Sequence, residues 1–186
     1  MKRKKRIVAV SIVVCVLAAA FGIRYKKLNE KYPAAVVMEY SYGDIITLEG
    51  FQIKYTNREV LDQEDFFEKY QVEDEIKGYY EHYPTKFLVA EFWIKNIETE
   101  ENNYYRAFSE DAVEYQAFAN GEDINFLKYV NEDDEWDGYL EPEEEKVIKL
   151  VYPIPKSLLT KKHWENAKEL DYAVVLRNYR EKIVIR

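Results

Sequence analysis

The stretch "KFLVAEFWIKN", residues 86–96, decides the fold because apolar side chains occupy both faces of its extended chain. Successive side chains of a strand point to opposite faces. Four apolar residues share one face: Leu88, Ala90, Phe92 and Ile94. Three more occupy the other face: Phe87, Val89 and Trp93. A strand that is apolar on both sides is typical of the middle of a sheet with cover on each face. We therefore expect this stretch to be the central strand of the core.

Shorter alternating runs surround this strand and predict further strands. In "FQIKYTN" (51–57), the apolar residues Phe51, Ile53 and Tyr55 alternate with polar ones. Five more runs follow: "AVEYQAFA" (112–119), "EDINFLKYV" (122–130), "KVIKLVYPIP" (146–155), "DYAVVLRN" (171–178) and "KIVIR" (182–186). Asn120-Gly121 predicts a hairpin turn between the first two of these runs, and "YREK" predicts one between the last two. About seven strands without a βαβ rhythm predict a mainly β fold, an antiparallel sandwich.

Two segments have helical rather than strand spacing. "LDQEDFFEKYQ" (61–71) offers Asp62 as an N-cap and places Phe66, Phe67 and Tyr70 on one face. "SLLTKKHWENAKEL" (157–170) predicts a second short helix that packs through Leu159, His163 and Trp164. We expect both helices to be structural inserts in the sandwich.

The N-terminus predicts a membrane segment. Residues 7–23 carry no charge and, as a helix, would span roughly 25 Å, the lower limit for crossing a bilayer. The basic residues 1–6 before them favour a cytoplasmic N-terminus and a body outside the membrane. We expect residues 1–6 to be cytoplasmic, residues 7–23 to be a transmembrane or signal segment, and residues 24–34 to be a charged stalk. Residues 35–186 should form one domain, and the chain should contact the bilayer only through the N-terminal helix.

Three fates of the apolar segment compete. Ala18 and Ala20 form an A-x-A pattern, so signal peptidase could leave a chain that begins at Phe21. The run continues to Ile23 without a polar cleavage region, which favours an uncleaved anchor. Lipidation of Cys15 is the third fate, although the residues before that cysteine are not those of a lipobox.

Charge divides unevenly along the chain. Residues 1–31 contain nine Lys or Arg and one acid. The remaining residues carry 18 basic and 34 acidic groups, a net charge of −16 (18 − 34), whereas the whole chain has a net charge of −8. An acidic body repels phosphate backbones. We therefore expect no nucleic-acid partner.

The order of these segments resembles the immunoglobulin-like domains of unknown function in small membrane-anchored proteins and lipoproteins of Gram-positive cell envelopes. Three stretches carry the resemblance: "YGDIITLEGFQIKYTNREVLD" (42–62), "KFLVAEFWIKNIETEENN" (86–103) and "LEPEEEKVIKLVYPIPKSL" (140–158). It spans most of residues 36–186 and implies an immunoglobulin-like β-sandwich with no catalytic residues. This chain departs from it at Glu143, where family members commonly have glycine after the proline.

The sequence lacks the usual residues of most enzymes. Two histidines, His82 and His163, and one cysteine inside the apolar segment cannot form a Cys/His pair or a His-rich zinc site. No serine lies in a G-x-S-x-G turn, and no glycine-rich phosphate loop is present. Carboxylate pairs carry no signal, because acids are so numerous. We expect no enzyme, no catalytic residue and no cofactor.

Two ligand hypotheses remain open. Five tyrosines could stack on sugars or simply pack on a sheet: Tyr79, Tyr80, Tyr83, Tyr104 and Tyr105. The stretch "DDEWDGYLEPEE" (133–144) nearly spells a calcium loop, with four candidate ligands: Asp133, Glu135, Asp137 and Glu144. Pro142 and flanking strands argue against calcium, so we expect a solvated loop and no metal.

These observations favour a membrane-anchored, extracytoplasmic, non-enzymatic interaction module of the cell envelope, whose partner is another envelope protein. A small-ligand module for glycan or calcium is the alternative, and a wall-polymer hydrolase comes third.

Overall fold

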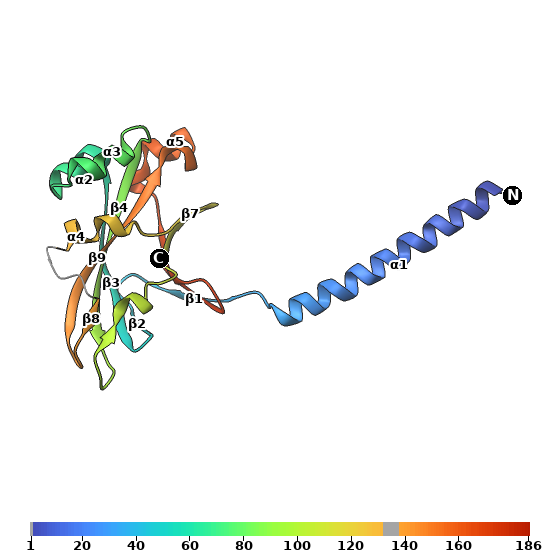
Figure 1. Ribbon diagram of the computed structural model, residues 1–186, viewed down its shortest axis with the longest axis horizontal. Coiled ribbons are helices and arrows are strands. Elements are labelled where there is room, and N and C mark those ends of the chain that lie inside the picture. Colours follow the sequence, from blue (N-terminus) through green and yellow to red (C-terminus); the bar gives the residue numbers. More distant parts are fainter. Residues whose placement is uncertain (1, 132–137) are drawn as a thin grey trace. The chain divides into compact units, whose positions relative to one another are not determined.

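The computed structural model describes residues 2–131 and 138–186 (Figure 1). Side chains are described from residue 14 onward. The chain divides into two compact units, Met1–Val36 and Val37–Arg186, and each is described by itself.

The first unit contains one helix, α1 (Lys2–Lys31). The apolar residues 7–23 lie within it, and it continues through most of the segment that the sequence predicts as a stalk. The helix ends two residues before Pro33, since the proline ring and its missing N–H prevent a helix from continuing. Among the described residues, no helix combines the length and the apolar character that crossing a membrane requires.

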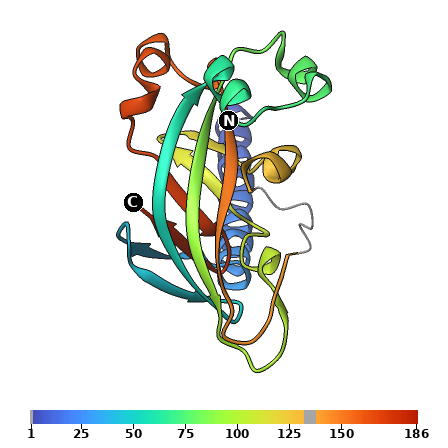
Figure 2. The same ribbon diagram turned by 90° about the vertical axis from the view of Figure 1, so that its left-hand side faces the viewer.

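The second unit is a sandwich of two mainly antiparallel sheets, as predicted. The edge strand β1 differs, because the Arg186 N–H donates to the Tyr40 carbonyl and the Tyr42 N–H donates to the Arg186 carbonyl, which is the pattern of a parallel pair. One sheet has the strand order β2-β3-β4-β9 and the other β1-β11-β10-β6-β7. Figure 2 shows the long strands β3, β4 and β9 side by side in teal, green and orange. The strands of the two sheets are β1 (Val36–Tyr40), β2 (Ile45–Leu48), β3 (Phe51–Asp62), β4 (Thr85–Asn96), β6 (Ala112–Tyr115), β7 (Phe118–Asn120), β9 (Glu145–Pro155), β10 (Ala173–Arg177) and β11 (Glu181–Ile185). A short separate pair joins β5 (Asn102–Asn103) to β8 (Tyr139–Leu140).

The main core lies between the two sheets. Ile53 and Phe92 of one sheet and Val174 and Ile185 of the other belong to one buried cluster. Burial of apolar surface from both sheets is the dominant favourable contribution to the folding of such a sandwich.

β4 is the central strand, as the sequence predicts. β3 pairs with one side of it and β9 with the other, so that Phe92 lies opposite both Tyr55 and Ile148. All four residues predicted to face inward are buried in the main core: Leu88, Ala90, Phe92 and Ile94. The outer face is covered at one end only. Phe87 and Val89 are buried in a second cluster there, whereas Trp93 is partly exposed and donates to Glu145.

Short helices cover that end of β4. Three of them contribute to the second cluster: α2 (Gln63–Lys69), α3 (Asp74–Tyr80) and α4 (Leu127–Val130), whereas α5 (Lys161–Glu165) lies outside that cluster. Phe66 of α2 stacks on Phe87 with ring centroids 4.4 Å apart. Both predicted helical segments are confirmed, but Asp62 does not cap α2 with its side chain, because its carboxylate binds Lys86 and Lys168 instead. His163 and Trp164 of α5 contact Tyr115 and Lys86 as ring and cation partners.

The hairpin predicted at Asn120-Gly121 is wrong. β6 and β7 do form a hairpin, but Tyr115 pairs with Phe118, so the turn lies at Gln116-Ala117, where Gln116 has a φ of 53°. Residues 122–130 are not a strand and form a 3₁₀ turn followed by α4. The Asn120 side chain explains the difference, because its amide donates to the carbonyl of Pro153 at 2.8 Å and holds the chain against β9.

Glu143 occupies a backbone conformation that favours glycine. Residues 141–144 form a turn closed by a 3.1 Å hydrogen bond from the Glu144 N–H to the Glu141 carbonyl, and Glu143 has a φ of 64°. Positive φ at the third position with proline at the second is the geometry of a type II turn. The position at which the sequence departs from the resembling family therefore carries strain.

Glu143→Gly should raise the free energy of unfolding by about 0.5–1 kcal/mol, because relief of the left-handed strain outweighs the larger entropy of an unfolded glycine. The ion pair of Glu143 with Lys95, 2.7 Å long, is exposed and contributes little. Denaturant unfolding measures the change. Glu143→Ala keeps the Cβ atom and should not stabilise the chain, so equal effects of the two substitutions would contradict this account.

Candidate functional site

A tyrosine-lined depression of about 570 Å³ lies between α3, the chain that follows β7 and the end of β9. Its rim exposes Tyr79, Tyr83 and Ile124, with exposed fractions of 69%, 69% and 68%. Its lining also includes Tyr80, Asn120, Glu122, Asp123 and Ser157. An apolar depression with a few converging polar groups is the usual form of a binding site. We call it the tyrosine depression.

The local sequence builds one wall of this depression around Asp123. Asp123 precedes a 3₁₀ turn, η2 (Ile124–Phe126), and its Oδ1 accepts from the backbone N–H and the side-chain amide of Asn125 at 3.0 and 2.9 Å. Its other oxygen, Oδ2, accepts from the Tyr80 hydroxyl. The backbone N–H of Asp123 donates to the Val151 carbonyl of β9 at 2.8 Å. Asp123 thus joins α3, η2 and β9, and both of its carboxylate oxygens are occupied.

Glu122 is the acidic lining residue that has no such partners. Its Oε2 is buried without a hydrogen-bond partner within the part of the chain that the structure describes. Burial is the largest cause and the charges of Asp111 and Asp123 add to it, and together they raise the pKa of Glu122 to about 8. Unpaired buried polar atoms are rare and call for an explanation.

Asp111 continues this acidic group into the interior. It is only 8% exposed, and its Oδ2 accepts from the hydroxyl of the fully buried Tyr152 on β9. Burial raises the pKa of Asp111 and outweighs the opposing Tyr152 hydrogen bond, so that the pKa is about 7. Burial and the nearby Asp111 also raise the pKa of Tyr152. Perturbed titratable groups next to a depression are typical of functional sites, although structural networks show them too.

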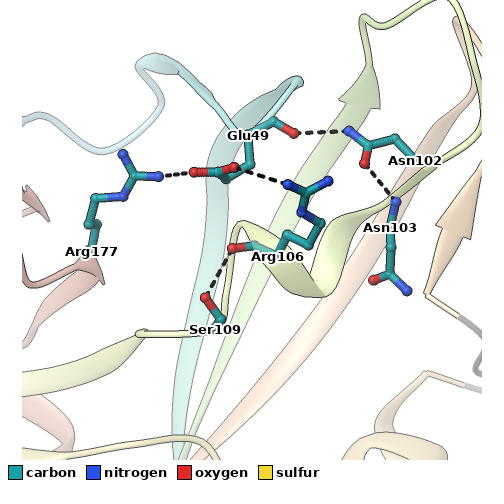
Figure 3. Close-up of polar contacts among 6 residues, drawn as sticks. All are labelled: Glu49, Asn102, Asn103, Arg106, Ser109 and Arg177. Atoms are coloured by element: carbon teal, nitrogen blue, oxygen red, sulfur yellow. Dashed lines mark hydrogen bonds and ion pairs between the residues drawn. The ribbon is translucent and has the colours of Figure 1, made fainter.

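Two other hollows are less suited to a ligand. A larger one, of about 650 Å³, lies on the outer face of β3, β4 and β9 and has a mixed charge, with Glu59 paired to Lys69 and Lys128 paired to Glu73. Figure 3 shows a polar cluster beside another hollow, in which the Glu49 carboxylate bridges Arg106 and Arg177. Glu49 thus forms ion pairs with both arginines, and these pairs join the β2–β3 turn to neighbouring elements.

The tyrosines singled out by the sequence separate into two groups. Tyr79, Tyr80 and Tyr83 meet in the tyrosine depression. Tyr104 is 1% exposed and Tyr105 is partly buried against the main core, with their ring centroids 5.1 Å apart, so these two pack as structural residues. Of the sequence-predicted residues, only the first group therefore shares a surface site.

Three calcium candidates, Asp133, Glu135 and Asp137, lie outside the described residues. Glu144 is described, and its Oε2 accepts from the Glu141 N–H at 2.8 Å within the turn. Within residues 2–131 and 138–186, no group of three or more His, Cys, Asp or Glu side chains could hold a metal ion.

Sequence reasoning missed Asp111 and Glu122. Both are single acids among many, and their burial depends on contacts distant in sequence, such as that of Asp111 with Tyr152. The available signal is the Asn120-Gly121 pair, which predicts a hairpin turn rather than a wall of a binding site.

The comparisons with known proteins point to one family. A family model described as a domain of unknown function, DUF5028, matches residues 35–182. No curated protein matches the chain significantly.

Two solved structures resemble the chain. One is an uncharacterized beta-sandwich protein from Clostridium difficile 630, with 17% identity, a TM-score of 0.49, and coverage of 82% of this chain and 95% of that one. The other is a conserved hypothetical protein from Bacillus anthracis, with 16% identity, a TM-score of 0.44, and coverage of 79% and 95%.

Proposed function

The chain belongs to the DUF5028 family of domains of unknown function, and from that premise we propose that it is a membrane-anchored, extracytoplasmic module of the cell envelope. It acts without catalysis, by contact with another envelope protein. The observation that carries this proposal is the abrupt division of charge. A basic segment and an uncharged run of 17 residues, 7–23, precede a body with 34 acids and 18 basic residues.

The basic residues 1–6 support the orientation, because Lys and Arg beside an apolar segment favour the cytoplasmic side. The uncharged run 7–23 supports a spanning segment by its sequence, and these residues lie within helix α1. The finding that no helix can span a membrane concerns the described side chains, which begin at residue 14. Retention of this helix as an anchor places the body in the cell envelope. The same proposal includes a Gram-positive envelope, which the resemblance of the sequence supports. It also includes an immunoglobulin-like class of sandwich, which the resemblance and the two facing sheets support.

The burial of Asp111 supports a non-catalytic role. A general acid must reach the substrate atom that it protonates, whereas the Asp111 carboxyl is 8% exposed and bound to Tyr152 inside the sandwich. A saccharide-binding role is the second candidate, and the grouping of Tyr79, Tyr80 and Tyr83 at one depression favours it.

Protease accessibility tests the proposed location. A protease added to cells whose wall has been removed should digest the body and leave a small N-terminal membrane fragment, because residues 1–6 stay inside. Mass spectrometry of the membrane fraction then separates the three fates of the helix. An intact N-terminus means an anchor, a start at Phe21 means cleavage, and a diacylglyceryl group on Cys15 means a lipoprotein. A body that stays protected until the cells are lysed would exclude the extracytoplasmic location.

A further inference from the structure

We propose that the tyrosine depression binds a positively charged side chain, lysine or arginine, carried by a peptide segment of the partner protein. This inference rests on the proposed function in one respect, that the chain acts by contact with a protein. It adds the site of contact and the chemistry of the partner.

The exposed rings are the first support. Tyr79 and Tyr83 are each 69% exposed at the rim of the same depression, and Ile124 beside them is 68% exposed. Neighbouring apolar and aromatic groups that remain open to water are typical of an interaction surface. The face of a tyrosine ring attracts an ammonium or guanidinium group. Lys128 lies over the Tyr129 ring in this way, 4.7 Å from its centroid.

The charge of the lining is the second support. Of the residues that line the depression, the charged ones are Glu122 and Asp123, and neither lysine nor arginine is among those described. An acidic lining disfavours phosphate and other anionic ligands and favours a cation. The net acidity of the whole body acts in the same direction over a longer range.

The hydrogen-bond inventory distinguishes the two acids. Both oxygens of Asp123 already accept from Tyr80 or Asn125, so Asp123 holds the wall in place. Glu122 keeps an oxygen without a hydrogen-bond partner in the described structure. Because Glu122 lines the depression, a turn of its carboxyl group toward the open side would offer this acceptor to a lysine or arginine N–H. Its positive charge would also offset the repulsion that Asp111 and Asp123 exert on the Glu122 carboxylate.

A neutral saccharide is the competing ligand. It could stack on the same rings and bond to the same carboxyl group, but it would not use the acidic charge of the lining. The two ligands therefore differ in salt and pH dependence, which the experiment exploits.

The test is fluorescence anisotropy of a labelled peptide that contains two arginines separated by glycines, titrated with the full chain in a non-ionic detergent. We expect saturable binding that weakens as salt rises. Tyr79→Ala with Tyr83→Ala should weaken binding about tenfold, because two cation–ring contacts are lost. Tyr179→Ala, which removes an exposed tyrosine of the β10–β11 turn, should leave binding unchanged and serves as the control.

The pH dependence gives an independent readout. The groups that act on Glu122 are Asp111, Asp123 and the neighbouring Tyr152. A bound cation stabilises the ionised form of Glu122, so binding should release a proton below a pH of about 8 and should tighten as pH rises toward that value. Glu122→Gln should weaken binding and remove most of this pH dependence while leaving the rings in place.

Three outcomes would overturn the inference. The first is that a matched peptide with glutamates in place of the arginines binds equally well. The second is that the Tyr79 and Tyr83 substitutions do not change binding of the arginine peptide. The third is that an N-acetylglucosamine oligomer binds in a way that depends on those tyrosines, while the arginine peptide does not bind. The last would favour the saccharide alternative. Because the purified chain is used, a failure here is distinct from a failure of the cellular location, which the protease experiment tests separately.

Discussion

Replacing Phe92 with alanine should lower the free energy of unfolding by about 3–5 kcal/mol, a large part of the stability of a domain of this size. Phe92 is fully buried in the middle of β4. Its ring stacks on Tyr55 at 5.1 Å between centroids and contacts Phe108 at 5.2 Å. The substitution leaves a cavity between the two sheets that surrounding strands cannot close, because pairing on both sides fixes β4. Denaturant unfolding followed by tryptophan fluorescence measures the loss.

Lys95→Ala is the control on the same strand. Lys95 lies on the outer face, where its ammonium group pairs with Glu143 and Glu145. Ion pairs with exposed partners contribute little, so the loss should stay below about 1 kcal/mol. Equal shifts of the unfolding midpoint for the two variants would show that the assignment of Phe92 to the inner face of β4 and of Lys95 to its outer face is wrong.

The second large effect is a dependence of stability on pH that comes from Glu122 and Asp111. Their pKa values in the folded chain are about 8 and about 7, against 4.5 and 3.8 as ordinary values. As pH rises above about 4, the unfolded chain loses these protons while the folded chain keeps them. Their contribution to stability is therefore fully present below pH 4 and is lost as pH rises through 7 and 8. Asp62 has the opposite effect on stability, because Lys168 and Lys86 lower its pKa in the folded chain. The stability that it contributes is lost as pH falls into the acidic range.

Glu122→Gln separates the effect of this one carboxyl group from the others. The variant should gain stability relative to the parent as pH rises, because it lacks the carboxyl group that ionises. Between pH 4.5 and pH 9 the difference in unfolding free energy should change by on the order of 3 kcal/mol in favour of the variant, a value that is reduced for the partial exposure of Glu122. Unfolding titrations at several pH values measure this difference. A difference that stays constant over the whole range would mean that Glu122 ionises normally in the folded chain.

The strands could be predicted because burial leaves a period of two in the sequence. β3, β4, β9, β10 and β11 each show that period or a continuous apolar run. The 3₁₀ turn and helix at 124–130 could not be predicted, because the apolar residues of that segment fit a strand equally well. What decides its structure is the attachment of Asn120 and Asp123 to β9, a contact distant in sequence.

The candidate site could be predicted only in part. Exposed tyrosines near residue 80 are visible in the sequence, but their meeting with Glu122 depends on how the chain after β7 crosses the end of β9. The burial of Asp111 against Tyr152 is likewise a product of the two-sheet packing. Sequence patterns report which face of an element is apolar. They do not report which acid loses contact with water when two sheets close on each other.

One labelling experiment tests the central claim, an extracytoplasmic module with an open tyrosine depression. Tyr83→Cys, in a chain whose single native cysteine is removed by Cys15→Ala, puts a thiol at an exposed rim position. A membrane-impermeant maleimide should label it on intact cells without a wall, whereas Lys4→Cys in the same background should react only after lysis. If the thiol at position 83 also reacts only after lysis, the body lies inside the cell and the proposed function is wrong.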